Sequence, residues 1–168
     1  GDECEKLIKG NWLDPACGSG VFLIAVINYA LKNCARLSIS DLIEFIVCNL
    51  YGIDKSPEAL QAATYNLALR VCLLDNTRQF GSTLSQLKSN FYLCDSTKLD
   101  GKSQLGLIFP KLVEGVDFLV SNPPYSKRNS TDGQLSLFQA LDDPDYSDRP
   151  TTSSGNTYLE FVEMLFRL

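Results

Sequence analysis

Short apolar runs alternate along the chain with longer stretches of helical periodicity. Each apolar run is only a few residues long and stops at a polar residue, as expected of a strand buried on both faces. The longer stretches carry good helix formers and begin at capping signals, such as Ser38 or Ser40 and the Ser56-Pro57 pair. The pattern predicts strands over residues 11–14, 50–54, 91–95 and 115–121, and helices over residues 21–34, 38–49, 56–74 and 156–168.

The remaining segments give weaker patterns. Residues 1–10 are predicted to be a polar lead-in or a helix remnant, and residues 75–90 a loop. Residues 98–112 suggest a loop and a short helix that stops near Pro110. Residues 126–155 are rich in Ser, Thr, Asp, Asn and Pro, which is typical of a lid or a disordered loop.

Strands that alternate with helices predict an α/β fold with a doubly wound, mostly parallel sheet and helices on both faces. Such sheets bind ligands at the carboxyl ends of their strands. Four polar residues fall at predicted strand ends, and they are Asp14, Asp54, Asp95 and Asn122. We expect one domain over residues 1–168, with a cofactor half at about 11–100, a catalytic motif at 116–125, a lid-like segment at 126–155 and a final helix at 156–168.

Composition excludes several classes of protein. The 168 residues are 45% apolar and 21% charged, as in an ordinary globular domain. There is no apolar run near the ~20 residues that span a bilayer, and we expect no membrane partner. The six cysteines form no C-x-x-C pair, and the absence of histidine excludes Ser-His and Cys-His catalysis. We therefore expect no metal, buried reduced thiols and a cytoplasmic protein.

The charge limits what this segment does with a nucleic acid. The net charge is -5, whereas a free-standing DNA-binding domain normally carries a basic stripe that neutralises phosphates. If the substrate is DNA, most contacts with its phosphates must come from parts of the protein outside these 168 residues.

The stretch from Asp14 to Gly20 has the pattern of a ligand loop between a strand and a helix. Gly18 and Gly20 let the backbone approach a ligand and present N–H groups at a helix start, although helix–strand packing also uses such glycines. A carboxylate at Asp14 would repel a pyrophosphate. It suits a cationic group instead, such as an ammonium or a sulfonium.

The next two strand ends extend this site. Asp54 lies where nucleotide-binding folds place an acid for ribose hydroxyls, although it would also favour the dipole of the following helix. The Lys55 stem could lie along an adenine, or the side chain could be solvated. Asp95 is either an acceptor for an adenine amino group or an ordinary turn aspartate. Together they describe a site for an adenosine with an attached amino acid.

Asn122-Pro123-Pro124-Tyr125 carries the sharpest signal. The N6 amine of adenine is a poor nucleophile because its lone pair is delocalised into the ring. Acceptors such as the Asn122 side-chain oxygen and the Pro123 carbonyl would localise that pair and stabilise the developing positive charge. The two prolines fix the backbone, and Tyr125 offers a ring on which a base can stack. The alternative is a simple proline-forced turn.

These motifs resemble those of amino-group methyltransferases that use S-adenosylmethionine, specifically the gamma group of DNA N6-adenine enzymes, in the Eco57I-like or type I modification-subunit form. The resemblance implies a Rossmann-like class I methyltransferase fold, here incomplete, and double-stranded DNA with a flipped adenine as the partner. It assigns catalysis to Asn122, Pro123, Pro124 and Tyr125. It assigns cofactor binding to Asp14, Pro15, Ala16, Cys17, Gly18, Gly20, Phe22, Asp54, Lys55, Asp95 and Ser96.

Two departures and three alternatives accompany this resemblance. The segment that family members place before the first strand and the target-recognition domain after residue 168 are both missing, so we expect weak cofactor binding and poor DNA methylation. A specificity subunit or a fused recognition or nuclease domain would supply the rest. Release-factor glutamine methyltransferases, RNA amino methyltransferases and a non-catalytic domain of a phage-defence protein are the alternatives. The Pro15-Ala16-Cys17 core favours DNA over protein as substrate.

Overall fold

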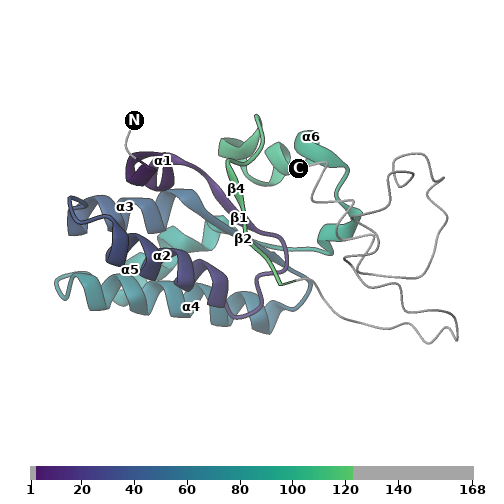
Figure 1. Cartoon of the computed structure of the whole chain (residues 1–168). Helices are drawn as coiled ribbons and strands as arrows, with labels where there is room; N and C mark the ends of the chain where they lie inside the picture. The colour runs from purple at the N-terminus through teal and green to yellow at the C-terminus, as the bar shows by residue number, and fades with distance from the viewer. Residues whose placement is uncertain (1–2, 123–168) are drawn as a thin grey trace, which may run out of the picture.

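A four-stranded parallel sheet lies at the centre of the computed structural model, which describes residues 3–122 (Figure 1). Its order is β3-β2-β1-β4, and every neighbouring pair is parallel. The chain steps outward from β1 to β3 and then returns across the sheet to β4. This reversal creates a topological switch point between β1 and β4, where such folds bind ligands. The strands are β1 (Trp12–Asp14), β2 (Leu50–Asp54), β3 (Phe91–Leu93) and β4 (Phe118–Leu119).

Helices cover both faces of the sheet, but unequally. One face carries α2 to α5 over a large apolar cluster, and the other carries α6 over a smaller one. The predicted doubly wound α/β architecture is therefore confirmed. The helices are α1 (Glu3–Lys9), α2 (Val21–Asn33), α3 (Ile39–Asn49), α4 (Pro57–Leu74), α5 (Phe80–Leu87) and α6 (Gly101–Ile108), with 3-10 turns at Lys88–Asn90, Ser96–Lys98 and Pro110–Leu112.

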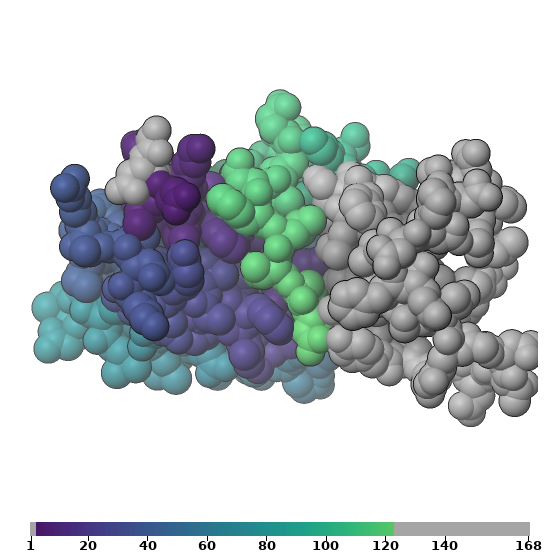
Figure 2. All heavy atoms as spheres, in the orientation of Figure 1, coloured from purple at the N-terminus to yellow at the C-terminus, as the bar shows by residue number. Residues whose placement is uncertain are grey.

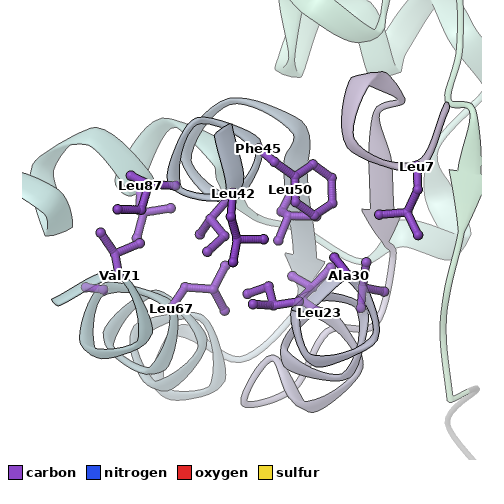
Figure 3. Packing of buried hydrophobic residues seen from close by; sticks show 14 residues of the cluster. Leu7, Leu23, Ala30, Leu42, Phe45, Leu50, Leu67, Val71 and Leu87 are labelled. Atoms are coloured by element: carbon purple, nitrogen blue, oxygen red, sulfur yellow. The ribbon is translucent and has the colours of Figure 1, made fainter. Parts of the chain in front are cut away.

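The alternation of side chains along β2 divides the core between the two faces. Leu50 enters the large cluster, whereas Tyr51 and Ile53 enter the small one, as the period of two requires. In the large cluster the side chains of Leu23, Leu42, Phe45, Leu67 and Leu87 converge from four helices (Figure 3). Burial of these helix faces against the sheet fixes where the strand ends lie.

The predicted helix starts are confirmed. Ser38, rather than Ser40, caps α3, and its hydroxyl and the Asp41 carboxylate form a capping box. The Ser56 hydroxyl accepts the N–H of Ala59 at 3.1 Å, and Pro57 is the first residue of α4. These caps set the points at which the chain leaves the sheet and turns into each helix.

Two of the weaker predictions need correction or completion. The prediction of a loop over residues 75–90 is wrong, because α5 and a 3-10 turn occupy residues 80–90. Most polar side chains of α5 face solvent. Thr83 and Leu87, four positions apart, form the narrow buried stripe that holds the helix against the rest of the protein. Residues 3–9 form helix α1, with Leu7 buried, and the helix predicted before Pro110 is confirmed as α6.

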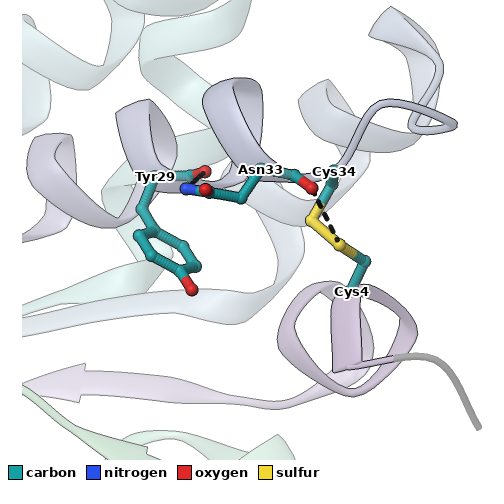
Figure 4. The surroundings of a disulfide bond; sticks show 4 residues. All are labelled: Cys4, Tyr29, Asn33 and Cys34. Atoms are coloured by element: carbon teal, nitrogen blue, oxygen red, sulfur yellow. Dashed lines mark hydrogen bonds between the residues drawn. A yellow bond between two sulfur atoms is a disulfide. The ribbon is translucent and has the colours of Figure 1, made fainter.

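The expectation that all cysteines are reduced is also wrong. Cys4 and Cys34 form a disulfide that joins α1 to the end of α2, with 5.5 Å between their Cα atoms (Figure 4). The two residues are 30 positions apart, so only the packing of α1 beside α2 brings them together. Four cysteines are free thiols: Cys17, Cys48, Cys72 and Cys94.

The remaining expectations concern parts of the chain that the structure does not describe, or the membrane. The predicted lid at 126–155 and the predicted helix at 156–168 lie outside the described residues. Among the helices of residues 3–122, none has the length and apolar character needed to cross a bilayer.

Candidate functional site

Asp14 is the most unusual side chain at the switch point. It ends β1 and is 0% exposed. Its Oδ1 accepts the N–H of Ala16 at 3.1 Å, but Oδ2 has no hydrogen-bond partner among the described residues. Burial raises the pKa of this carboxyl to about 6, with a smaller rise from the charge of Asp54 and opposing effects from the Ala16 N–H and the nearby Ser121 hydroxyl. A cation that reached Oδ2 would satisfy the carboxylate and lower that pKa.

The loop that follows Asp14 is tied to the end of β2. The Cys17 N–H donates to the carbonyl of Ile53 at 2.9 Å, and the Gly18 N–H donates to Asp54 Oδ2 at 2.8 Å. The Gly20 N–H closes the turn onto the Cys17 carbonyl at 2.8 Å. The loop is therefore held in place at both ends before any ligand arrives.

The two glycines of the loop do different things. Gly20 has φ +81° and starts α2, and a Cβ there would meet Ala63 at 3.2 Å and Leu67 at 3.3 Å. Gly20 thus permits the close packing of α2 on α4. Gly18 has φ +52°, and a Cβ there would meet no described atom within 4 Å. Only Gly18 has the free space that a ligand approaching the backbone needs.

The other predicted residues of this loop contribute mainly through packing and backbone. The Cys17 side chain is buried against Leu60 and Ala63, and burial raises the pKa of its thiol, which therefore stays neutral. Pro15 is buried and Ala16 is half-buried, while Phe22 is exposed on the first turn of α2. Any contact of Cys17 with a cofactor must therefore come from its backbone.

Asp54 holds two backbone segments. In addition to the Gly18 N–H, its carboxylate accepts the N–H of Ser56 at 2.9 Å, which fixes the entry to α4. Each oxygen keeps a second lone pair, so the predicted role toward ribose hydroxyls stays a prediction. Lys55 is exposed beside it.

Asp95 has the contacts of a turn aspartate. Its Oδ1 accepts the backbone N–H of Thr97 at 3.2 Å and the Thr97 hydroxyl at 2.7 Å, and its Oδ2 lies 3.8 Å from Lys98 Nζ. Ser96 is buried in the 3-10 turn that Asp95 caps. Asp95 follows the strand next to Asp54, and the Cys94 N–H donates to the Asp54 carbonyl at 3.1 Å. The three aspartates therefore line one edge of the sheet, as predicted.

The fourth strand brings the second motif to the same edge. The Val120 N–H donates to the Leu13 carbonyl at 3.0 Å, and the chain then leaves the sheet through Ser121 and the exposed Asn122. In the space-filling view the green surface of this segment lies beside the purple N-terminal segment (Figure 2). Pro123, Pro124 and Tyr125 lie outside the described residues.

Sequence reasoning missed Ser121. Its hydroxyl is buried and completes no well-formed hydrogen bond among residues 3–122, yet it lies close enough to Asp14 to lower the pKa of that carboxyl as a weak hydrogen-bond donor. The only signal in the sequence was a polar residue at the end of an apolar run.

Within residues 3–122 there is no group of three side chains suited to hold a metal ion. A groove of about 440 Å³ lies between α4, α5 and β3, and another of about 350 Å³ lies beside the disulfide. Neither is lined by Asp14, Asp54 or Asn122. The candidate site thus lies at the strand ends, apart from both grooves.

Comparisons with known proteins agree with this geometry. The family described as N-6 DNA Methylase matches residues 7–166. Type II methyltransferase M.BanIII of Aneurinibacillus aneurinilyticus is 30% identical over 120 residues, which cover 71% of this chain and 17% of that protein. This chain therefore spans only a small part of the length of that curated relative.

Two solved structures share the fold. A nuclease-deletion mutant of the Type ISP restriction-modification enzyme LlaGI, in complex with a DNA substrate mimic, gives a TM-score of 0.65 at 17% identity over 99% of this chain and 15% of that one. The ATP-dependent Type ISP restriction-modification enzyme LlaBIII, bound to DNA, gives 0.63 at 16% identity over 99% of this chain and 12% of that one. The family match extends over nearly the whole sequence, and the chain belongs to the N-6 DNA methylase family.

Proposed function

We propose that the protein containing this chain transfers a methyl group from S-adenosylmethionine to N6 of adenine in DNA, within a restriction-modification system. The observation that carries the proposal is Asp14, a fully buried carboxylate with one unpartnered oxygen, next to the segment that ends in Asn122. An acid in this state calls for a cationic ligand at the switch point. Membership of the N-6 DNA methylase family supports the choice of reaction.

The residues present fit the cofactor. Asp14 Oδ2 would accept from the ammonium of its methionine part, and the free space at Gly18 would admit it to the backbone. Asp54 would accept from the ribose hydroxyls, and Asp95 would accept from the adenine amino group. The carboxylates of Asp54 and Asp95 already hold backbone N–H groups, so they are fixed in place beforehand. S-adenosylmethionine would supply an electrophilic methyl group on a sulfonium.

Asn122 would act on the substrate amine. Its side-chain oxygen would accept from the N6 amine and stabilise the positive charge that develops as the nitrogen–carbon bond forms and the sulfur–carbon bond breaks. The amine then loses a proton to water, so no general base is required, and this chain has no histidine to provide one. We propose the same role for the Pro123 carbonyl, and a stacking role for Tyr125.

The proposed substrate is duplex DNA with the target adenine flipped out of the stack, because N6 is not reachable inside the helix. The two structural neighbours were solved with DNA or a mimic of it. Because the net charge of this chain is -5, we propose that most contacts with DNA come from elsewhere in the protein, from a fused recognition or nuclease domain or a specificity subunit. An enzyme that modifies cellular DNA would work in the cytoplasm.

A methyl-transfer assay tests the proposal. The complete gene product is incubated with labelled S-adenosylmethionine and, separately, duplex DNA, RNA and release factor, and we expect label at N6 of adenine in DNA. Asn122→Ala should abolish transfer and leave cofactor affinity near normal, while Asn76→Ala, at an exposed position, should change neither. Label in release factor or RNA but not in DNA would overturn the proposal.

A further inference from the structure

Ser121 has no role in the function proposed above, yet its hydroxyl is one of the few buried polar groups without a partner in the described structure. Within residues 3–122, three buried side-chain atoms lack a hydrogen-bond partner: Asp14 Oδ2, Ser121 Oγ and Arg70 Nε. Asp14 ends β1 and Ser121 lies two residues beyond the end of the neighbouring β4, so both atoms lie at the switch point. Native structures leave few such atoms, so two at one edge call for a common explanation.

The backbone holds Ser121 where it is. Leu13 pairs with Leu119, and the Val120 N–H donates to the Leu13 carbonyl at 3.0 Å, one residue before Ser121 and one residue before Asp14. At the other end of the pairing, the Asn11 N–H donates to Asp117 Oδ2 at 2.8 Å. The register of β4 on β1 therefore brings the end of β4, and Ser121 just beyond it, to the Asp14 end of β1 without any contribution from the serine side chain.

The chemistry of the pair fits an ammonium group. An ammonium has three donors, whereas a carboxylate oxygen and a hydroxyl oxygen both accept, and a hydroxyl can also donate to a carboxylate. With Oδ1 of Asp14 already bound to Ala16, the remaining acceptors at this point are Asp14 Oδ2 and Ser121 Oγ. A single ammonium placed between them would satisfy both.

We propose that Ser121 is a binding residue for the ammonium group of S-adenosylmethionine, which it shares with Asp14. This inference rests on the proposed function. It adds to the proposed ammonium site a residue that follows β4 and immediately precedes Asn122 in the sequence. The same serine therefore joins the cofactor half of the site to the segment that would hold the substrate base.

Calorimetric titration of the complete gene product tests the proposal with two ligands. S-adenosylmethionine carries the ammonium, whereas 5′-methylthioadenosine lacks the whole amino-acid part. Ser121→Ala should weaken binding of S-adenosylmethionine about tenfold, the value of one ordinary hydrogen bond, and leave binding of 5′-methylthioadenosine unchanged. Ser121→Thr keeps the hydroxyl and should restore most of the affinity. Ser103→Ala, an exposed serine on α6, is the matched control.

Each outcome has a defined meaning. An equal loss with both ligands would show a purely structural role for Ser121, and no loss with either would show that it is not a ligand; both results overturn the inference and leave the proposed function intact. If the complete wild-type protein binds 5′-methylthioadenosine but not S-adenosylmethionine, the amine site itself is refuted, and the inference falls with it. A complete wild-type protein that binds neither ligand would overturn the cofactor assignment as well.

A measurement without ligand gives an independent readout. The Ser121 hydroxyl lowers the pKa of Asp14 in the free protein, so NMR titration of the Asp14 carboxyl carbon should show a higher pKa in Ser121→Ala than in wild type. An unchanged value would mean that the hydroxyl and the carboxylate do not interact, and would also overturn the proposal.

Discussion

The burial of Asp14 has a consequence for stability as well as for binding. In the unfolded chain an aspartate titrates near 3.8, whereas burial raises the pKa of folded Asp14 to about 6. The folded state therefore holds the proton more tightly. Asp14 contributes stability below about pH 4, and that contribution is lost as the pH rises through 6, by on the order of 2–3 kcal/mol. Without a cation, the site destabilises the protein at neutral pH.

Asp14→Asn isolates this effect. The amide keeps the shape and the acceptor for the Ala16 N–H but does not ionise. As the pH rises from 4.5 to 7.5, we therefore expect the free energy of unfolding of the variant to increase relative to that of wild type. Urea unfolding at several pH values measures the difference. Asp100→Asn, at an exposed carboxylate, is the control and should follow the wild-type curve. Parallel curves for wild type and Asp14→Asn would contradict the assignment.

Gly18 and Gly20 give a second prediction, because their surroundings differ. Alanine at Gly20 combines a left-handed backbone with contacts on Ala63 and Leu67, so we expect a loss of about 2–4 kcal/mol in unfolding free energy. Alanine at Gly18 meets no described atom, so only the backbone cost of about 1–2 kcal/mol applies. Urea unfolding separates the two.

Substitution of Gly20 should cost more stability, whereas substitution of Gly18 should cost more cofactor affinity. Gly18→Ala should weaken S-adenosylmethionine binding more than its small stability loss explains. The alanine Cβ would occupy the free space beside the loop backbone that the cofactor is proposed to approach. Gly81→Ala on α5 also meets no described atom, but its helical position makes it the control without a stability loss. Equal stability losses at Gly18 and Gly20 would contradict this division of roles.

Single residues at strand ends were predictable, whereas their contacts were not. Asp14, Asp54 and Asp95 each follow an apolar run, and the topology of a parallel sheet brings such positions to one edge. The bond from the Gly18 N–H to Asp54 joins residues 36 positions apart and depends on the path of the loop. Ser121 was missed for the same reason, since only the register of β4 places it next to Asp14.

Among the elements, those with strong local signals were predictable. Capping serines and Pro57 mark α3 and α4, and both begin where expected. Helix α5 was not predictable, because its buried stripe is only two residues wide and its support comes from α4 and α3. Helix α1 is similar, since it is only seven residues long and is held by tertiary bonds, from Trp12 Nε1 to the Leu7 carbonyl at 2.9 Å and from Asn49 Nδ2 to the Lys9 carbonyl at 3.1 Å.

The disulfide adds a covalent tie to these bonds, and it gives a third prediction. Crosslinking Cys4 to Cys34 across 30 positions restricts the unfolded chain, so the oxidised protein should be more stable than the reduced one by about 2–4 kcal/mol. Cys4→Ser should remove that difference, and thermal unfolding with and without dithiothreitol measures it. Cys72→Ser, at a free thiol, should keep the response. A wild-type protein indifferent to the reductant would contradict the prediction.

In a reducing cytoplasm the pair would be held as thiols, and α1 would be held by the buried Leu7 side chain and by the hydrogen bonds from Trp12 and Asn49. The redox state of the pair therefore also tests the proposed location. Thiol counting by mass spectrometry on protein alkylated inside cells gives the answer directly, and a fully oxidised pair would argue against a cytoplasmic protein.

For the whole molecule, the sequence predicted a parallel sheet between helix layers, because alternation of strands and helices follows from hydrophobic pattern alone, but it did not predict the strand order that creates the switch point. It did not predict how unevenly the faces are covered. Helices α2 to α5 pack on one face over the larger cluster, and the smaller cluster on the other face is covered by α6 and the turns beside it. The site edge lies where these layers end, at the carboxyl ends of the strands.

The charge of the whole molecule gives the last prediction. Fifteen basic and twenty acidic residues leave a net charge of -5, so this chain can release few counterions from DNA. We expect it to bind a short duplex more weakly than the ~10⁻⁴–10⁻⁶ M typical of non-specific binders at physiological salt, and with little dependence on salt. Fluorescence anisotropy at two salt concentrations measures both, with the complete gene product as the comparison. Micromolar binding by this chain, lost steeply as salt is raised, would instead place a phosphate-binding surface within these 168 residues.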